Sequence, residues 1–338
     1  MRGTLNIFTL MKEFNATIII PTLNEEKFIA PCIESIVNQS FPIEKMDIMV
    51  IDGGSIDKTK DIVEQYIKKY PNIRFINNPK QIQSVAFNIG VQNSSAPWII
   101  RLDAHALYHP DYVKKCIEYL ESDGSIGNVG GVWDIKPHNT SLQATANSIV
   151  NQVRFGIGGA SFRVGAEAGE VDTVPFGAFP RKVIEEVGGM REDLPRGEDK
   201  EIKSRIKKAG YKIFLDPSIV STYFARPTIL ASVKQMYKNG LSIGWLINID
   251  RSSIGLRHLI PILFSMSLMI SLVVLIIVPS LWWIFIGILI VYSIAAFIAS
   301  YLACRKFGFR YFFILPVIFF CIHSAYGLGT LIGIFYKN

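Results

Sequence analysis

Two residues with metal-ligating side chains, Asp103 and His105, follow a short run at residues 98–102 whose apolar members are Trp98, Ile99, Ile100 and Leu102. A short apolar run of this kind predicts a buried strand. In open α/β sheets, ligands bind just beyond the carboxyl ends of parallel strands. An aspartate and a histidine at that place can both ligate one divalent cation. A polar turn would show the same two residues, so the rest of the chain must decide between the two interpretations.

Polar residues also follow the first two apolar runs, at residues 16–20 and 48–51. If these runs are strands parallel to residues 98–102, their carboxyl ends lie at one edge of the sheet. A carboxylate there can accept a hydrogen bond from a base, and a metal can neutralise a diphosphate leaving group. We therefore predict transfer from a nucleotide-activated donor, although Asp52 is also a typical helix-capping turn residue. The residues concerned are Thr22, Asn24, Glu25, Asp52, Gly53 and Gly54.

A second acidic pair, Glu198 and Asp199, opens a predicted helix that ends near Ala209. The helix dipole favours an ionised carboxylate at this end by about 0.3 to 1 kcal/mol. An ionised carboxylate can take the proton of an acceptor hydroxyl as that oxygen attacks. Asp199 is the first candidate for this base and Glu198 the second, while simple capping of the helix is the alternative.

The elements that position these residues alternate between strand and helix. This alternation predicts an α/β fold with a mainly parallel sheet and right-handed crossovers. The glycine-rich segment at residues 139–170 interrupts the pattern and is expected to be a mobile lid or a surface loop. The expected strands are 16–20, 48–51, 73–76, 98–102, 128–135, 171–179 and 211–215, and the expected helices are 25–38, one from Asp57, 83–91, 111–120, 181–187 and 196–209.

The chain is 50% hydrophobic, and the excess is concentrated near its carboxyl end. Residues 259–304 carry no charge, and residues 312–336 carry none apart from His323. Because about 20 apolar residues cross a bilayer core, and because Pro279 divides the first stretch, we predict three transmembrane helices at about 259–278, 281–303 and 312–335.

Positive charge is concentrated beside these helices. Residues 200–257 hold eleven lysines and arginines against three acidic residues. The positive-inside rule then places the large amino-terminal part in the cytoplasm, in a multi-pass protein of the cell membrane, with the carboxyl end outside. A basic surface next to apolar spans favours anionic lipid over nucleic acid as the partner. The expected parts are an extension at 1–14, a catalytic domain at 15–227, a basic amphipathic juxtamembrane link at 228–257 and a transmembrane domain at 258–338.

Six segments, in this order and spacing, resemble family 2 glycosyltransferases with the GT-A fold, over about the first 225 residues. The sequence DAH in place of DxD, the glycine-rich segment and the apolar tail make the chain most similar to the succinoglycan-type subgroup, which adds sugars to lipid-linked saccharides during polysaccharide biosynthesis. The segments are IIIPTLNEE (18–26), VIDGGSIDKT (50–59), NIG (88–90), RLDAHA (101–106), GAF (177–179) and GEDKEIKSRIKKAGY (197–211).

The resemblance implies roles for individual residues. It implies a UDP- or GDP-sugar donor, a lipid-linked acceptor, Asp103 and His105 at a divalent ion, and Asp199, or else Glu198, as the catalytic base. One base and direct displacement imply inversion. The donor site would comprise Pro21, Thr22, Asn24, Glu25, Asp52, Gly53 and Asp103, and the acceptor site Arg163, Phe176, Gly177 and Ala178.

Two departures from the family pattern limit what it implies. The Q-x-x-R-W motif of processive synthases is absent, since residues 235–238 read QMYK, so a single sugar addition is expected. His105 replaces the usual second aspartate, which leaves the choice between Mn²⁺ and Mg²⁺ open. Two other functions remain open: a polyprenyl-phosphate sugar synthase, and a noncatalytic nucleotide-binding domain that regulates a membrane transporter.

Overall fold

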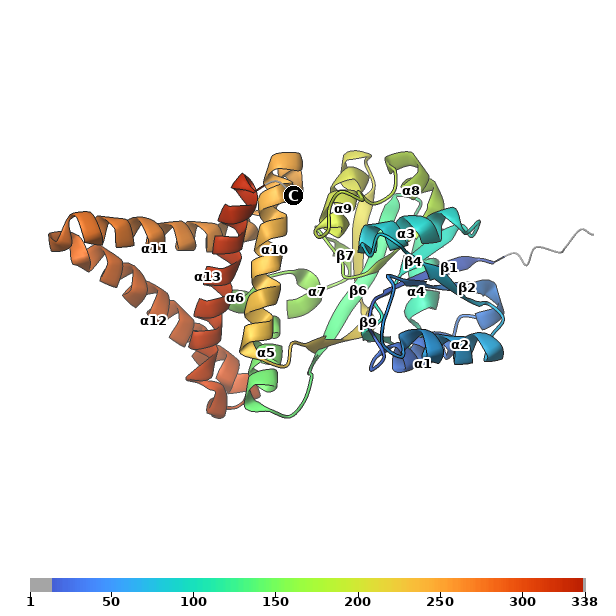
Figure 1. Cartoon of the computed structure of the whole chain (residues 1–338), viewed down its shortest axis with the longest axis horizontal. Helices are drawn as coiled ribbons and strands as arrows, with labels where there is room; N and C mark the ends of the chain where they lie inside the picture. Colours follow the sequence, from blue (N-terminus) through green and yellow to red (C-terminus); the bar gives the residue numbers. More distant parts are fainter. Residues whose placement is uncertain (1–13, 337–338) are drawn as a thin grey trace, which may run out of the picture.

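The computed structural model describes residues 14–336, so the expected extension lies outside the described residues except for Phe14. These residues form a sheet-based domain and a group of long helices (Figure 1). The strands form one sheet with the order β3-β2-β1-β4-β8-β6-β9-β5, and β7 pairs with β9. Their bounds are β1 (Ala16–Thr22), β2 (Met46–Asp52), β3 (Ile73–Asn77), β4 (Trp98–Arg101), β5 (Ala106–Tyr108), β6 (Ile126–Pro137), β7 (Gly169–Glu170), β8 (Gly177–Pro180) and β9 (Lys212–Ala225).

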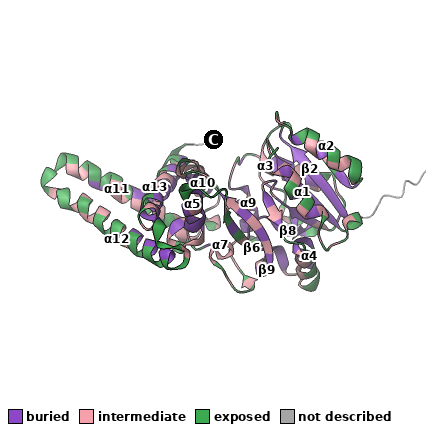
Figure 2. Cartoon of the chain, turned by 90° about the horizontal axis from the view of Figure 1, so that it is seen from below, coloured by how far each residue is buried: buried purple, intermediate pink, exposed green. Residues whose placement is uncertain are grey.

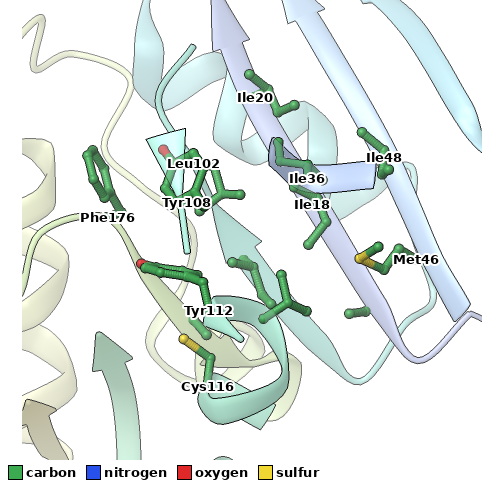
Figure 3. Close-up of a cluster of buried hydrophobic side chains, with 14 of the residues drawn as sticks. Ile18, Ile20, Ile36, Met46, Ile48, Leu102, Tyr108, Tyr112, Cys116 and Phe176 are labelled. Carbon is green, nitrogen blue, oxygen red and sulfur yellow. The ribbon is translucent and has the colours of Figure 1, made fainter. Parts of the chain in front are cut away.

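The first four strands are parallel neighbours, which confirms the predicted alternation. β1 pairs in parallel with both β2 and β4, and β2 pairs with β3. Helices cover both faces of this part of the sheet, so successive side chains are buried at residues 16–20 of β1 and along the whole of β2. Ile18 and Ile20 pack with Ile36 of one helix (Figure 3). Ile19 belongs to a separate buried cluster together with Phe87. The helices are α1 (Ile29–Val37), α2 (Thr59–Lys69) and α3 (Gln83–Gln92).

The second half of the sheet is mixed. β8 runs antiparallel to β4. β6 and β9 pair in parallel, and β5 pairs antiparallel with β9. Residues 102–105 therefore form the connection from β4 to β5. β9 is much longer than the strand expected at 211–215, because it extends along β6 to Ala225. The helices of this half are α4 (Tyr112–Ser122), α8 (Arg181–Val187) and α9 (Glu198–Lys208).

The glycine-rich segment differs from the expected lid or loop. It holds α5 (Leu142–Gln152), α6 (Arg154–Ile157) and α7 (Ser161–Val164). The apolar side chains Ala146, Ile149 and Val150 of α5 are buried in one cluster with residues of the carboxyl-terminal helices. Their helical spacing puts these side chains on one side of α5, which accounts for their burial. The high glycine content of the whole segment concealed this helix in the sequence.

Three carboxyl-terminal helices are long and apolar enough to cross a membrane, as predicted. In Figure 2, α11 and α12 are largely exposed, whereas α10 and α13 carry many buried residues. The helices are α10 (Ile229–Ile249), α11 (Leu259–Ile277), α12 (Trp282–Phe307) and α13 (Ile314–Phe335), and the short 3-10 helices are η1 (Ile43–Lys45), η2 (Arg251–Ser253), η3 (Leu256–His258), η4 (Pro279–Leu281) and η5 (Phe309–Tyr311).

Glycines let α10 pack directly against α13. A Cβ on Gly244 of α10 would lie 2.5 Å from the carbonyl carbon of Gly333, and one on Gly240 would overlap the backbone of Tyr326. Such close backbone contact through small residues is typical of helix pairs in membrane proteins. The segment expected to be a juxtamembrane link is thus mostly one helix that shares a tight interface with the last apolar helix.

Candidate active site

The loops after β1 and β2 are hydrogen-bonded to each other. Asn24 adopts a φ of 54°, and its side-chain oxygen accepts from the backbone N–H of Ile56 at 2.9 Å. The Asp52 carboxylate accepts from the backbone N–H groups of Gly54 and Ser55 at 2.9 and 2.8 Å. Both side chains therefore shape the loops, and for Asp52 this is the turn role that the sequence also allowed.

The other predicted donor residues gather at the same edge. Pro21 lies opposite Ile51 in the parallel register. The Thr22 hydroxyl donates to the carbonyl of Ile20 at 3.0 Å, and the Gly53 N–H donates to the carbonyl of Thr22 at 2.8 Å. The side chain of Thr22 is therefore buried and already bonded within the chain.

Asp103 is fixed in the connection between β4 and β5. The Tyr108 hydroxyl accepts from the Asp103 backbone N–H at 2.7 Å and donates to its carbonyl at 3.0 Å. Carboxylate atom Oδ1 accepts from Arg101 at 2.8 Å and from Gln83 at 3.2 Å. Within residues 14–336 no donor reaches Oδ2, so one carboxylate oxygen remains for a ligand.

His105 is oriented by Glu25, which the sequence had assigned to the nucleoside. The Nδ1 atom lies 3.0 Å from Glu25 Oε1. Although burial opposes protonation, the hydrogen bond to Glu25 raises the pKa of His105. When Nδ1–H donates to the carboxylate, Nε2 is left as a free acceptor, as in metal-ligating histidines that a carboxylate orients.

The structure offers a cation two side-chain ligands at this turn. Among the described residues, no group of three or more His, Cys, Asp or Glu side chains could hold a metal ion by itself. Asp103 Oδ2 and His105 Nε2 are the free atoms, and Mn²⁺ and Mg²⁺ both accept mixed oxygen and nitrogen ligands with substrate phosphates completing the set. The residues present therefore fit a cation that is shared with a bound diphosphate.

Glu198 and Asp199 have opposite surroundings at the start of α9. Glu198 is 5% exposed, whereas the side chain of Asp199 is 39% exposed. Burial and the charge of Asp199 raise the pKa of Glu198. Burial opposes ionisation of Asp199, but the charges of Lys203 and Lys200 outweigh it and hold the pKa of this carboxyl below its usual value. Asp199 is therefore the exposed, ionised member of the pair.

Neither member of this acidic pair occupies the N-cap position of α9. Gly197, in a left-handed conformation with φ of 90°, occupies the N-cap position, and no side chain caps the helix there. A Cβ on Gly197 would lie 3.2 Å from Leu246 of α10, so a glycine is needed both for the backbone angle and for the space. The start of α9 is thus held against α10.

Arg101 interacts with one of the two possible cation ligands, Asp103, and also with the acidic pair Glu198 and Asp199. Its guanidinium is buried, donates to Asp103, and interacts electrostatically with Glu198 and Asp199. These charges raise the pKa of Arg101 although burial opposes protonation. We did not single out Arg101 from the sequence, although it stands in the quoted segment RLDAHA.

The predicted acceptor residues separate into two groups. Arg163 and Phe176 lie together around Trp133: the Arg163 guanidinium is 4.3 Å from the Trp133 ring and the Phe176 ring is 5.8 Å from it. Burial lowers the pKa of Arg163 to about 10, which leaves it charged at neutral pH. Its guanidinium donates to Asn151 and is enclosed by aromatic rings, so the structure gives no support for a role in binding a diphosphate.

Gly177 and Ala178 lie inside the sheet. They pair with Arg101 and Ile100 of β4, and Ala178 is fully buried. A Cβ on Gly177 would overlap the Asn128 amide. Contact between an acceptor and these two side-chain positions is not supported, because the strand itself fills the space.

Three cations near Asp199, namely Arg196, Lys200 and Arg257, form no salt bridge with an acidic side chain among residues 14–336, although the charge of Asp199 acts on Lys200. Burial lowers the pKa of Lys200 to about 8, and the charges of Arg257 and Arg196 act in the same direction. No ion pair of the described residues includes these three side chains, and Arg226, close enough to His105 to influence its charge, has none either. In the sequence, Arg257 is one of the basic residues beside the apolar helices, and its distance from α9 in the chain hides this proximity.

Comparisons with known proteins agree with this geometry. A sequence model of the family described as Glycosyl transferase family 2 matches residues 17–188. The chain is 30% identical over 330 residues to a dolichyl N-acetyl-alpha-D-glucosaminyl phosphate 3-beta-D-2,3-diacetamido-2,3-dideoxy-beta-D-glucuronosyltransferase of Methanococcus voltae, covering 95% of this chain and 98% of that one. It is 29% identical over 250 residues to succinoglycan biosynthesis protein ExoA of Rhizobium meliloti, covering 73% and 74%.

Solved structures show the same fold. The mannosyltransferase PcManGT from Pyrobaculum calidifontis, in complex with GDP-Man and Mn²⁺, aligns with a TM-score of 0.60 at 17% identity, over 96% of this chain and 88% of that one. TarS residues 1–349 from S. aureus, in complex with UDP-GlcNAc, aligns with a TM-score of 0.54 at 14% identity, over 94% and 91%. The sheet-based domain therefore has the GT-A fold.

Proposed function

The chain belongs to glycosyl transferase family 2 and is a glycosyltransferase, and on that premise we propose that it moves one sugar, with inversion, from a nucleotide-sugar to a lipid-linked saccharide. The observation that carries the proposal is the buried Arg101, which donates to Asp103 and interacts electrostatically with the carboxylate of Asp199. The two ligands for a cation at the donor diphosphate, Asp103 and His105, and the base for the acceptor hydroxyl then belong to one site. The noncatalytic interpretation is set aside by the family assignment.

The donor is proposed to bind at the ends of β1, β2 and β4. The nucleoside would lie against the loops that Asn24 and Asp52 shape, and the diphosphate would extend toward Asp103 and His105. A bound Mn²⁺ or Mg²⁺ would neutralise the leaving diphosphate. Glu25 would orient His105 for that role, and Arg226 would add positive charge beside it.

The acceptor is proposed to arrive on the side of Asp199. The ionised carboxylate accepts the proton of the acceptor hydroxyl while that oxygen attacks the anomeric carbon and the bond to the diphosphate breaks. Attack opposite the leaving group inverts the anomeric configuration. We assign the acceptor's phosphate to Arg196, Lys200 and Arg257, which form no salt bridge among the described residues, in place of Arg163, whose guanidinium is enclosed by aromatic rings.

The relatives support an acceptor that already carries a sugar. The Methanococcus voltae relative is named for an acceptor that is a dolichyl-linked sugar phosphate, and the Rhizobium meliloti relative for succinoglycan biosynthesis. A polyprenyl-phosphate sugar synthase would use the lipid phosphate alone. We further propose a cell-membrane location with the catalytic domain on the cytoplasmic side, where nucleotide-sugars are made and where basic residues beside the apolar helices are retained.

The test is a ligand panel on the purified protein. Nucleotide-sugars are added with Mn²⁺ or Mg²⁺ and the melting temperature is recorded, since a ligand at 100 times its Kd stabilises by about 2.7 kcal/mol. The stabilising donor is then incubated with polyprenyl phosphate and with a polyprenyl-linked sugar phosphate. Product from the second acceptor alone supports the proposal, product from the first alone identifies a synthase, and no donor turnover contradicts both.

A further inference from the structure

We propose that α13, although apolar and long enough to cross a bilayer, lies along the membrane surface, and that only the α11–α12 hairpin enters the lipid. The carboxyl end of the chain would then be on the same side of the membrane as the active site. The proposal concerns the bilayer as partner and does not depend on the assigned reaction. It differs from the three crossings expected from the sequence.

The first observation is that both halves of α13 are attached to the catalytic domain. In its first half, Leu315 and Phe319 share a buried cluster with Ile149 and Val150 of α5. At its other end, the carbonyl of Ile334 accepts from the Asn248 side chain of α10 at 2.8 Å. The helix is therefore held along its length and does not project away from the domain.

The second observation concerns the elements at those two attachments. The end of α10 is bound to α9, because Asp250 accepts from Ser204 and Lys208, each at 2.7 Å. Both α5 and α9 pack against the same strands, β6 and β9. If α13 crossed a bilayer core of about 30 Å, the bilayer would have to lie between α5 and α9. The sheet that joins them occupies that position.

The hairpin has the opposite character. From residue 272 to residue 295 no side chain is buried, and none is charged. The three helices form a triangle in Figure 1, with η4 at the apex and α13 as the side opposite it. Figure 2, turned by 90°, again shows α11 and α12 projecting away from α10 and α13. If the hairpin is inserted in the bilayer, the axis of α13 therefore lies along the membrane surface.

Lengths agree with this arrangement. α11 has 19 residues and so spans about 28 Å at 1.5 Å per residue. It crosses α13 near its own start, where Pro261 and Ser265 lie against Gly327. About 20 Å of helix then extends from Ser265 to the turn at Val278, which reaches most of the way through a hydrocarbon core.

The free face of α13 fits the interfacial layer of that membrane. Its exposed apolar side chains follow one another at spacings of three, four and, once, eight residues, which puts them on one side of the helix. The basic residues Arg257, Arg305, Lys306 and Arg310 stand at the two ends of the hairpin, where anionic headgroups would lie. The exposed stripe consists of Phe313, Val317, Phe320, Leu328, Ile332 and Phe335.

The depth of spin labels tests the proposal in the full chain in liposomes. Single cysteines replace Val317, Leu328 and Ile332 on α13, with Leu263, Ile270 and Ile277 on α11 as the matched series, in a background that carries Cys321→Ser. Collisions with oxygen and with a water-soluble nickel chelate report depth. Donor-dependent thermal stabilisation of each variant confirms its fold.

We expect the three α13 labels to lie at one depth near the headgroups, while the α11 labels become deeper along the helix. A second readout is a protease site after Asn338 in vesicles of known orientation, which should be cleaved from the side that carries the catalytic domain. Labels on α13 that pass through the bilayer midplane, or a protected carboxyl-terminal site, would overturn the proposal.

Discussion

Asp199 and Glu198 are neighbours in the chain, yet only Asp199 has the exposure and the charge of a general base. We expect Asp199→Asn to keep donor affinity and to lose about 10²- to 10⁴-fold in turnover, because the proton acceptor alone is removed. Initial rates at saturating donor, with donor binding measured separately, provide the check.

Glu198→Gln is the matched variant for that experiment. Because burial and the charge of Asp199 raise the pKa of Glu198 to about 7, much of this carboxyl is already neutral at neutral pH, and an amide at Glu198 should cost less turnover than one at Asp199. The order of the two effects decides between the two carboxylates. A larger loss for Glu198→Gln would exchange their roles.

The two proposed cation ligands, Asp103 and His105, predict that turnover depends on a divalent metal ion. Chelator should abolish turnover, and Asp103→Ala should weaken donor binding with metal present, because the free Oδ2 of Asp103 is proposed to share the ion with the diphosphate. Calorimetric titration of donor with and without Mn²⁺ measures the effect. Full activity in chelator would refute a metal-assisted leaving group.

Asp250 is a structural carboxylate whose contribution to stability depends on pH. Hydrogen bonds from Lys208 and Ser252 outweigh burial and hold the pKa of Asp250 well below its usual range. A lowered folded-state pKa means that the stabilisation is present above the unfolded value of about 3.9 and is lost as pH falls below it. Asp250→Ala should therefore cost about 1 to 3 kcal/mol at neutral pH and progressively less in acid.

The control for Asp250 is Asp172→Ala. Asp172 also pairs with a lysine of α9, Lys207, but its side chain is 69% exposed. A surface pair of this kind contributes about 0 to 1 kcal/mol. Thermal unfolding of the two variants between neutral and acidic pH compares them, and equal effects would mean that burial of Asp250 is unimportant.

At the scale of elements, the α10–α13 interface depends on glycine. Gly244→Val should destabilise the protein by about 1 to 3 kcal/mol or more, because the added side chain would collide with the backbone of α13. Gly287→Ala on α12 is the control, since nothing lies within 4 Å of its Cβ position. Melting in detergent measures both, and a neutral Gly244→Val would show that the two helices separate readily.

At the scale of the whole molecule, the active site and the membrane hairpin are joined through α9, α10 and α13. Arg257, just before α11, influences the charge of Lys200 beside the proposed base. We therefore expect a polyprenyl-linked sugar phosphate to be a much better acceptor than the same sugar without its lipid. Rates with both acceptors in liposomes test this, and equal rates would argue for a soluble acceptor.

The sequence by itself was enough for what depends on local pattern and motif. Apolar runs bounded by polar turns predicted the parallel strands, because strand formation there follows from short-range periodicity. The order of six segments indicated the family, and the uncharged stretches indicated three apolar helices. The pairs Asp103 and His105, and Glu198 and Asp199, also came from the sequence, although their roles remain predictions.

Only the tertiary structure decided which of these residues meet, because such contacts join positions far apart in the chain. The pairing of Glu25 with His105, the position of Arg101 between two carboxylate groups, and the enclosure of Arg163 by aromatic rings leave no local pattern. The glycines of α10 and α13 likewise looked unremarkable until the helices were placed side by side. A hydropathy profile measures whether a helix tolerates lipid, whereas its direction relative to the membrane depends on the elements to which its two ends are attached.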